Sequence, residues 1–271
     1  MQNKNGAVCV VFNPIVEDYI DNLKHYVSFF DELVVVDNSN DINHTLTQEL
    51  GVFKNVSYVP LRKNEGIGYA QNIGISHLSD FIDKICFFDQ DSWVSKEDLE
   101  KVTTLLSVGP TYGLLALSTE ETIQVEENKI IEVNEVISSG SVILREVFEQ
   151  LGKFDEDLFI DFVDYEFCWR MRKAGYRIGI VAGTQLVHQV NSAQVHKHTI
   201  SAPFRNYYSF RNAIILLKQR RVFKRKTYVI NLLIKRVVFE IFFNSKRLSR
   251  VRFICRGISD GIREKGGELI D

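Results

Sequence analysis

The chain has 271 residues, of which 45% are hydrophobic and 25% are charged, and its formal net charge is −2. These values are typical of one large globular domain with or without an appendage, and they exclude disordered, fibrous and disulfide-stapled proteins. The net charge hides an uneven distribution. Residues 1–204 carry 16 basic and 30 acidic side chains, a difference of −14, whereas residues 205–271 carry 17 and 5, a difference of +12. This asymmetry suggests an anionic partner for the basic part.

The cysteines and the apolar runs suggest the compartment. Cys9, Cys86, Cys168 and Cys255 lie far apart, without the short spacing of a metal or redox motif. Cys9 and Cys86 lie in apolar runs, which predicts reduced, buried thiols. No run has the length of a signal peptide, and none approaches the roughly 20 apolar residues that span a bilayer. We therefore expect a cytoplasmic protein, with a peripheral position at the inner face of the cell membrane as the further possibility that the basic part raises.

The first ninety residues alternate between two kinds of segment. Apolar runs at 7–12, 33–37, 56–61 and 85–89 predict strands, and the spacing of apolar residues at 16–30, 43–51 and 68–78 predicts helices. Strands that alternate with helices predict βαβ units and a mostly parallel sheet. Continuous apolar strands such as VCVVF and LVVVD also predict burial on both faces of that sheet.

The pattern changes along the rest of the chain. Residues 118–136 are polar and rich in Glu, which predicts a hairpin or loop excursion, and 137–144 return as a strand. A short helix at 145–151, an acidic and aromatic loop at 154–162 and a helix at 164–174 follow, the last ended by Gly175. Strands are predicted at 176–181 and 185–190. Beyond about residue 205 the pattern is helical and basic.

Two predicted strands end in an aspartate, Asp37 and Asp89. In open α/β sheets ligands bind outside the carboxyl ends of the strands, although a single Asp there often only caps a helix. Asp89 belongs to the sequence Asp89-Gln90-Asp91. Two carboxylates on a turn after a strand suit Mg²⁺ or Mn²⁺, which prefer oxygen ligands and bridge to substrate phosphates.

A glycine-containing turn precedes the predicted helix at 68–78. Gly66 and Gly68 partly match a dinucleotide-binding fingerprint, but Gln71 occupies the position of its third glycine, so a Rossmann dehydrogenase is excluded. Two interpretations remain. The glycines allow a tight strand-to-helix turn, or the helix N-terminus beside Arg62 and Lys63 receives a nucleotide phosphate.

The segment 154–172 combines carboxylates with aromatic residues. Asp164 is predicted in the first turn of a helix, where it either caps that helix or, half-buried near a phosphate, acts as a general base for a hydroxyl group. Arg170 is four residues after Glu166, which predicts an ion pair along the helix. His188 is either a structural residue in its strand or a third metal ligand.

Taken in chain order, these segments resemble those of family 2 glycosyltransferases. The resemblance covers about residues 7–215 and depends on VVFNP, VVVDNS, NEGIGYAQNIGI, FFDQDS, SSGSVIL, GKFDEDLFIDFVDYEFCWRMRKAGY, LVHQV and RNYYSFRN. DQDS with FIDFVDYEFCWR resembles the bacterial rhamnosyltransferase branch in particular. The resemblance implies the α/β GT-A fold, with a mostly parallel, mixed central sheet, here followed by basic C-terminal helices.

The resemblance also implies roles for individual residues. The nucleotide sugar would be bound by Asn13, Pro14, Asp37, Asn64, Gly66 and Asp89. Mn²⁺ or Mg²⁺ would be bound by Asp89, Asp91 and His188. Asp164 aligns with the aspartate of the family that serves as the base in an inverting, single-displacement transfer. Position 163 is Val where many members have Glu, a departure that the rhamnosyltransferase branch shares.

The function implied is transfer of L-rhamnose from dTDP-L-rhamnose to a hydroxyl of a surface polysaccharide acceptor, which in this family is often lipid-linked. Galactofuranose or a hexose from another nucleotide sugar stays open as an alternative. A sugar nucleotidyltransferase is a weaker alternative, because VFNPIVEDY lacks the glycine-rich, basic phosphate loop of that class. A non-catalytic binding module is weaker still, since the metal and base positions are intact.

We expect two parts in the chain. Residues 1–210 form the GT-A domain, with a nucleotide-binding half at about 1–117 and an acceptor-side half at about 118–210, and residues 211–271 form a basic amphipathic helical tail. Within 211–256, cations interleave with apolar residues, a pattern that suits the surface of an anionic membrane. The alternative is a basic face that packs on the acidic body. No nucleic-acid partner is expected, because no recognised binding module accompanies the charge.

Overall fold

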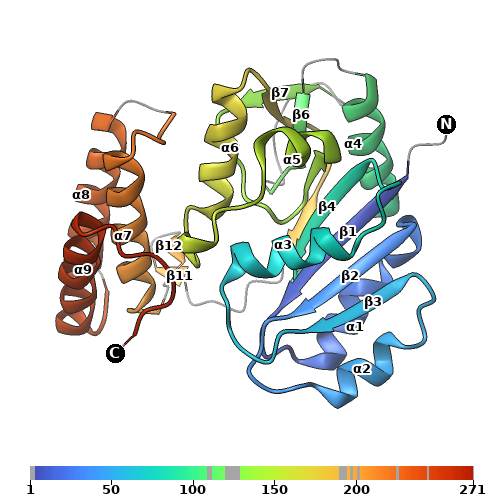
Figure 1. Ribbon diagram of the computed structural model, residues 1–271, viewed down its shortest axis with the longest axis horizontal. Coiled ribbons are helices and arrows are strands. Elements are labelled where there is room, and N and C mark those ends of the chain that lie inside the picture. Colours follow the sequence, from blue (N-terminus) through green and yellow to red (C-terminus); the bar gives the residue numbers. More distant parts are fainter. Residues whose placement is uncertain are drawn as a thin grey trace.

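The computed structural model describes residues 4–108, 112–119, 129–188, 194–195, 198–199, 202–223, 226–242 and 244–270. Its centre is an eight-stranded sheet with the order β3-β2-β1-β4-β8-β6-β9-β7 (Figure 1). All its strands except β7 and β8 run in one direction, so the prediction of a mixed, mostly parallel α/β sheet is confirmed. The strands are β1 Asn5–Val11, β2 Glu32–Asp37, β3 Val56–Pro60, β4 Lys84–Asp89, β6 Tyr112–Leu117, β7 Ile130–Val133, β8 Ser141–Leu144 and β9 Arg177–Val181.

Two short strand pairs lie outside this sheet. β5 (Ser92–Val94) pairs with β10 (Leu186–His188), and β11 (Gln194–Val195) pairs with β12 (His198–Thr199). β5 follows β4 after a two-residue turn, so the β5–β10 pair is anchored directly beside the carboxyl end of β4.

Helices cover both faces of the sheet, as the continuous apolar strands predict. In β1, Ala7, Cys9 and Val11 contribute to one hydrophobic cluster and Val8 and Val10 to another. The first cluster is covered by α1, α2 and α4, and the second by α3, α5 and α6. These helices are α1 Val16–Lys24, α2 His44–Leu50, α3 Ile67–His77, α4 Lys96–Val108, α5 Arg145–Leu151 and α6 Val163–Lys173, with 3₁₀ turns η1 Val27–Phe29 and η2 Glu156–Leu158.

Most predicted elements agree with the structure to within a few residues at their ends. The helix predicted at 16–30 is shorter, because α1 ends at Lys24 and η1 follows it. Nothing in the sequence analysis predicts β5, α4 or β6 in 92–117. Of the predicted excursion at 118–136, residues 120–128 lie outside the described part, and β7 lies within it. Cys9 and Cys86 are free and buried, as predicted.

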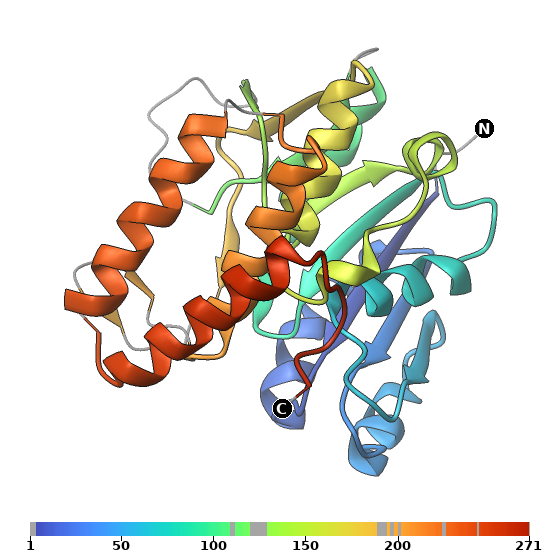
Figure 2. The same ribbon diagram turned by 60° about the vertical axis from the view of Figure 1, so that its left-hand side comes forward.

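Three helices form the C-terminal part: α7 Arg205–Lys218, α8 Lys226–Phe242 and α9 Arg247–Ile262. They stand to one side of the sheet in Figure 1, and in Figure 2 α8 leads away from the body while α9 returns to pack on α7. The boundary predicted at 210/211 falls inside α7, and the division into domains stays a prediction. Among the described helices, none combines the length and the apolar character that crossing a bilayer requires.

Candidate active site

A cavity of about 680 Å³ lies between the carboxyl end of β4, the start of α6 and the C-terminal helices α7 and α8. Side chains from five elements meet in it: α3, β4, α6, α7 and α8, together with residues of the loops between elements. The lining includes four acidic side chains and two arginines. Its lining consists of Ile67, Gln71, Asp89, Glu135, Ile137, Ser138, Ile160, Asp161, Phe162, Val163, Asp164, Tyr165, Trp169, Arg205, Ser209, Tyr228, Val229, Leu232 and Arg236.

Asp164 lies in the first turn of α6 and faces this cavity. Its carboxylate accepts a hydrogen bond from the backbone N–H of Tyr165 at 2.9 Å. The side chain keeps partial contact with solvent through the cavity but is otherwise surrounded by protein, and this burial is the main cause that raises the pKa of Asp164 to about 7. Repulsion from Asp161 and Asp89 adds to the effect. A carboxylate with such a pKa accepts a proton readily near neutral pH.

The two carboxylates of Asp89-Gln90-Asp91 face different hollows. Asp89, at the end of β4, lines the large cavity, whereas Asp91 lines a smaller hollow of about 90 Å³ beside Pro14. Gln90 holds the turn between them, because its side-chain oxygen accepts a hydrogen bond from Phe12 N at 2.7 Å. The turn is thereby fixed against the loop after β1, which contains the predicted donor residues Asn13 and Pro14.

The third predicted metal ligand, His188, is placed by its backbone. In the antiparallel pair of β5 and β10, His188 lies opposite Ser92, next to Asp91 in sequence, while its side chain lies outside the described residues. Among the side chains that the structure describes, no three His, Cys, Asp or Glu residues are grouped so as to hold a metal ion.

The donor residues predicted on β2 and after β1 lie together. Asp37 is buried, and its carboxylate accepts hydrogen bonds from Tyr58 Oη at 2.7 Å and from Ser39 N at 3.0 Å. Ser39 Oγ accepts in turn from Asn13 N at 2.7 Å. Asn13 has a φ of 45°, a left-handed conformation that Asn tolerates better than most residues. Asp37 thus holds Ser39 in the loop after β2, and Ser39 in turn binds Asn13 in the loop after β1.

Asn64 and Gly66 connect the donor side of the site to the loop before α6. Asn64 Oδ1 accepts hydrogen bonds from Asn38 Nδ2 and from Gly66 N, both at 3.1 Å. Gly66 has a φ of +87°, and a Cβ there would lie 2.6 Å from the carbonyl oxygen of Phe159. The same oxygen accepts from Ile67 N at 2.7 Å. A tight turn and a close approach therefore both require this glycine, and phosphate binding there stays a prediction.

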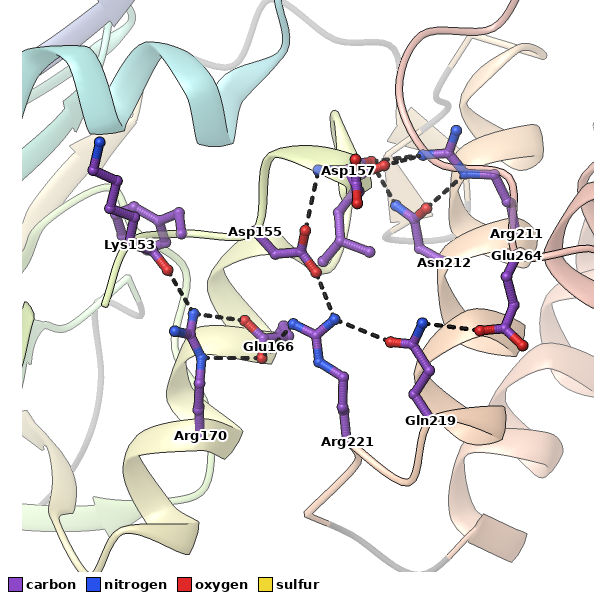
Figure 3. Close-up of polar contacts among 12 residues, drawn as sticks. Lys153, Asp155, Asp157, Glu166, Arg170, Arg211, Asn212, Gln219, Arg221 and Glu264 are labelled. Carbon is purple, nitrogen blue, oxygen red and sulfur yellow. Dashed lines mark hydrogen bonds and ion pairs between the residues drawn. The ribbon is translucent and has the colours of Figure 1, made fainter. Parts of the chain in front are cut away.

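The acidic run before and within α6 separates into structural residues and residues of the cavity. Glu166 is buried and pairs with Arg170 at 2.9 Å, which confirms the predicted pair, and also with Arg221 at 2.8 Å. Arg221 also pairs with Asp155 at 2.6 Å (Figure 3). Asp164 and Asp161 line the cavity instead, and Asp161 is bound by residues of α7.

Several cavity residues escaped the sequence analysis. Glu135 follows β7, accepts a hydrogen bond from Trp169 Nε1 at 3.0 Å and gave no motif signal. Arg205 begins the RNYYSFRN segment, to which no role was attached. Tyr228 and Arg236 belong to the basic segment, where the charge pattern favoured a partner outside the molecule rather than a place in the site.

The family model for glycosyl transferase family 2 matches residues 10–174, which run from the end of β1 through α6 and therefore include Asp37, Asp89 and Asp164. The chain belongs to this family. It is 33% identical over 249 residues to a dTDP-rhamnosyl transferase, RfbF of Shigella flexneri, covering 82% of each chain. It is 24% identical over 232 residues to a low-salt glycan biosynthesis hexosyltransferase, Agl10 of Haloferax volcanii, covering 76% of this chain and 73% of that one.

Solved structures agree with the GT-A fold of this glycosyltransferase. The mannosyltransferase PcManGT of Pyrobaculum calidifontis, in complex with GDP-Man and Mn²⁺, superposes with a TM-score of 0.62 at 13% identity. The match covers 99% of this chain and 77% of that one. The expected α/β GT-A fold with a mixed, mostly parallel sheet is confirmed.

Proposed function

We propose that this glycosyltransferase transfers L-rhamnose from dTDP-L-rhamnose to a hydroxyl of a surface polysaccharide acceptor, with inversion at the anomeric carbon. The observation that carries the proposal is Asp164, a carboxyl group with a pKa of about 7 that faces a large cavity together with Asp89. The similarity to a dTDP-rhamnosyl transferase supports the choice of sugar.

The chemistry follows from the position of Asp164. The acceptor hydroxyl enters the cavity and donates its proton to the Asp164 carboxylate as its oxygen attacks the anomeric carbon. A new glycosidic C–O bond forms, the bond from that carbon to the phosphate oxygen breaks, and dTDP leaves with the electron pair. Attack opposite the leaving group inverts the configuration. Asp164 then returns its proton to solvent through the cavity.

Asp89 and Asp91 would hold Mg²⁺ or Mn²⁺, with His188 as the proposed third ligand. By its chemistry the donor set fits such an ion, because carboxylate oxygens suit hard cations that take their remaining ligands from substrate phosphates and water. Since Asp89 and Asp91 line different hollows, one of them would bind the ion directly and the other directly or through water. When bound, the ion supplies positive charge for the departing diphosphate. Asn13, Pro14, Asp37, Asn64 and Gly66 are the proposed donor-binding residues, since their loops adjoin the Asp89–Asp91 turn.

A different donor sugar is the second candidate within the same reaction. The similarity to a hexosyltransferase supports a hexose, and galactofuranose is a further alternative. The family match is to glycosyl transferases, which decides against the sugar nucleotidyltransferase and the non-catalytic module.

We further propose a lipid-linked acceptor and a peripheral position at the inner face of the cell membrane. α8 and α9 support it, because they present apolar and basic side chains to the outside, as an anionic bilayer requires. The exposed apolar residues of these two helices are Tyr228, Ile230, Leu232, Ile234, Val238, Phe242, Leu248, Val251 and Ile262.

A donor screen tests the proposed function. Purified protein is mixed with dTDP-L-rhamnose, UDP-galactofuranose, UDP-glucose or GDP-mannose, with Mn²⁺ or with EDTA, and release of the nucleoside diphosphate is measured with water as the acceptor. We expect the fastest release from dTDP-L-rhamnose and its loss in EDTA. Faster release from another donor would identify that donor's sugar as the one transferred. Equal release rates in Mn²⁺ and in EDTA would refute the requirement for a metal ion.

A further inference from the structure

The loop that leads into Asp164 has an unusual backbone. In residues 157–162, here called the base loop, Phe159, Asp161 and Phe162 have φ values of 61°, 64° and 69°. Non-glycine residues rarely adopt such values, and bulky aromatic residues do so only where the surrounding structure enforces them. Phe162 is the N-cap residue of α6 and lies two residues before Asp164. The backbone conformation of Phe162 therefore determines where Asp164 lies relative to the cavity.

Helix α7 binds the backbone of the base loop. Asn212, fully buried, donates from Nδ2 to the carbonyl oxygens of Leu158 at 2.8 Å, Ile160 at 2.9 Å and Asp161 at 2.8 Å. The orientation of this amide is fixed, because Asn212 Oδ1 accepts from Arg211 Nε at 2.9 Å. One side chain thus binds three backbone carbonyls of the strained segment.

Three further residues of α7 bind the same loop. Arg211, also fully buried, donates from Nη2 to the carbonyl oxygens of Asp157 and Leu158, each at 3.0 Å (Figure 3). Ser209 Oγ donates to the Asp161 carboxylate at 2.6 Å, and Arg205 pairs with that carboxylate. All these donors lie on one helix, which the RNYYSFRN segment encodes.

We propose that Asn212, with Ser209 and Arg211, is a positioning residue of the reaction: α7 clamps the base loop so that the Asp164 carboxylate is presented to the acceptor hydroxyl. The inference rests on the proposed function, since it assumes that Asp164 is the base. It explains why polar side chains are buried at the start of a segment whose charge otherwise suggests an outside partner. It also gives the RNYYSFRN segment a role in the chemistry.

The clamp and most of the proposed donor residues contact different parts of the chain, which makes the inference testable. Asn13, Asp37 and Asn64 are bound by Ser39, Tyr58 and Asn38, and none of these hydrogen bonds involves α7. Gly66 does approach the base loop, at the carbonyl oxygen of Phe159, but the hydrogen bonds from α7 go to other groups of that loop. Loosening the clamp should therefore slow turnover and leave donor binding intact. A defect that only reduced the folded fraction would also lower turnover at an unchanged KM, so turnover is expressed per folded molecule, counted from the stoichiometry of calorimetric dTDP binding.

The experiment compares Asn212→Ala and Ser209→Ala with the unaltered protein. The probes are release of dTDP from dTDP-L-rhamnose in Mn²⁺ and calorimetric binding of dTDP with Mn²⁺. We expect kcat per folded molecule to fall about 10- to 100-fold for Asn212→Ala, because misplacing a reacting group by about an ångström costs this much. For Ser209→Ala we expect a smaller loss. The KM for the donor and the affinity for dTDP should stay within twofold.

Tyr207→Phe is the matched control. It removes a hydrogen bond of the same helix, from Tyr207 Oη to Asp260 of α9 at 3.1 Å, and should leave kcat within twofold. An unchanged kcat in Asn212→Ala, or an equal loss of donor affinity, would overturn the inference. If Asn212→Ala fails to fold, as judged by circular dichroism, Ser209→Ala decides by the same criteria.

The proposed base and the proposed clamp can be refuted separately. Near-normal turnover of Asp164→Asn would refute the base and with it the proposed mechanism. An inactive Asp164→Asn together with fully active Asn212→Ala and Ser209→Ala would refute the clamp alone.

Discussion

Helices α7 and α8 both belong to the basic C-terminal part, yet they relate to the protein in opposite ways. Most residues of α7 are buried, and its Arg211 is completely enclosed. In α8, by contrast, only Val229 and Glu240 are buried among the described residues, and its lysines are exposed. Arg205 and Arg211 of α7 bind a carboxylate and carbonyls of the base loop, whereas Lys226 and Lys235 of α8 are exposed at the surface.

This difference shows that a count of charge does not distinguish two uses of arginine. A buried guanidinium that binds several backbone carbonyls shapes the interior, and its charge is compensated there. An exposed cation on an apolar helix instead acts on what approaches the surface. α8 itself has two sides. Val229, Leu232 and Arg236 line the cavity, whereas other apolar residues of this helix are exposed on its outer side.

The largest effect on turnover should come from substituting Asp164, the residue that we propose α7 positions through the base loop. We expect Asp164→Asn to lower kcat for donor turnover about 10²- to 10⁴-fold, the range that a general base contributes. Calorimetric binding of dTDP with Mn²⁺ should change less than twofold. Asp157→Asn, at an exposed acid of the base loop, is the control and should retain full turnover. Equal losses in both variants would mean that the loop, not the base, had been disturbed.

Asp164 should also make stability depend on pH. Its pKa in the folded protein, about 7, lies above the ordinary value of 3.8, so the folded state retains a proton that the unfolded state has lost between these values. The free energy of unfolding therefore falls as pH rises from about 4 to 7. Asp164→Asn removes this penalty, by at most ~4 kcal/mol and by less where the carboxyl contacts solvent.

Thermal melts across pH check this sign. Asp164→Asn should melt above the unaltered protein at pH 8 and close to it at pH 4. The charged and titratable groups around Asp164 are Asp161 of the loop, Asp89 of β4, Glu135, Tyr165, Arg205 of α7, and Tyr228 and Arg236 of α8. A melting difference that does not depend on pH would show that burial does not perturb this carboxyl.

The link between α7 and α8 should be the next most sensitive point. Arg221 joins the buried Glu166 to Asp155, so Arg221→Ala leaves a buried carboxylate that still pairs with Arg170. Removing one partner of a buried pair costs 3–5 kcal/mol in general, and the partial exposure of Arg221 reduces our expectation to about 2 kcal/mol. Urea denaturation measures it.

Lys235→Ala is the matched control on α8, where the cation is exposed, and should change the free energy of unfolding by less than about 0.5 kcal/mol. If both variants cost the same, the contrast between the buried and the exposed helix would be lost.

The sequence predicted the sheet and the base helix because their signals are local. Apolar strands and glycine stops act over a few residues, so β1 to β4 and α6 appear close to where they were predicted. Asp89 and Asp164 line one cavity, and both were singled out as site residues by the family resemblance. Arg205 and Arg236 were missed because their place depends on long-range packing of α7 and α8, and Glu135 because its place depends on its contact with Trp169 of α6; no periodicity reports such contacts. The pair of Glu166 with Arg170 was predicted from their spacing, whereas its second partner, Arg221, comes from beyond α7 and was not.

The smallest expected effect concerns the outer face of α8. Ile234 and Phe242 are 56% and 65% exposed, and Lys235 lies beside Ile234. If this face binds an anionic bilayer, the double variant Ile234→Ser and Phe242→Ser should weaken binding to phosphatidylglycerol vesicles about 30-fold in co-flotation, because each of the two side chains contributes roughly 1 kcal/mol when it is partly buried in the interface. Point substitutions are preferable to truncation, since α8 also lines the cavity.

The control is a second double variant, Val52→Ser and Phe81→Ser, which removes exposed apolar residues from the catalytic body instead. It should float as the unaltered protein does, and neither variant should change turnover of dTDP-L-rhamnose in the absence of vesicles. Uncharged phosphatidylcholine vesicles should capture less of every protein, because the lysines and arginines of α8 and α9 then lose their attraction. Equal flotation of the two double variants would show that the exposed face of α8 is not the surface that meets the membrane.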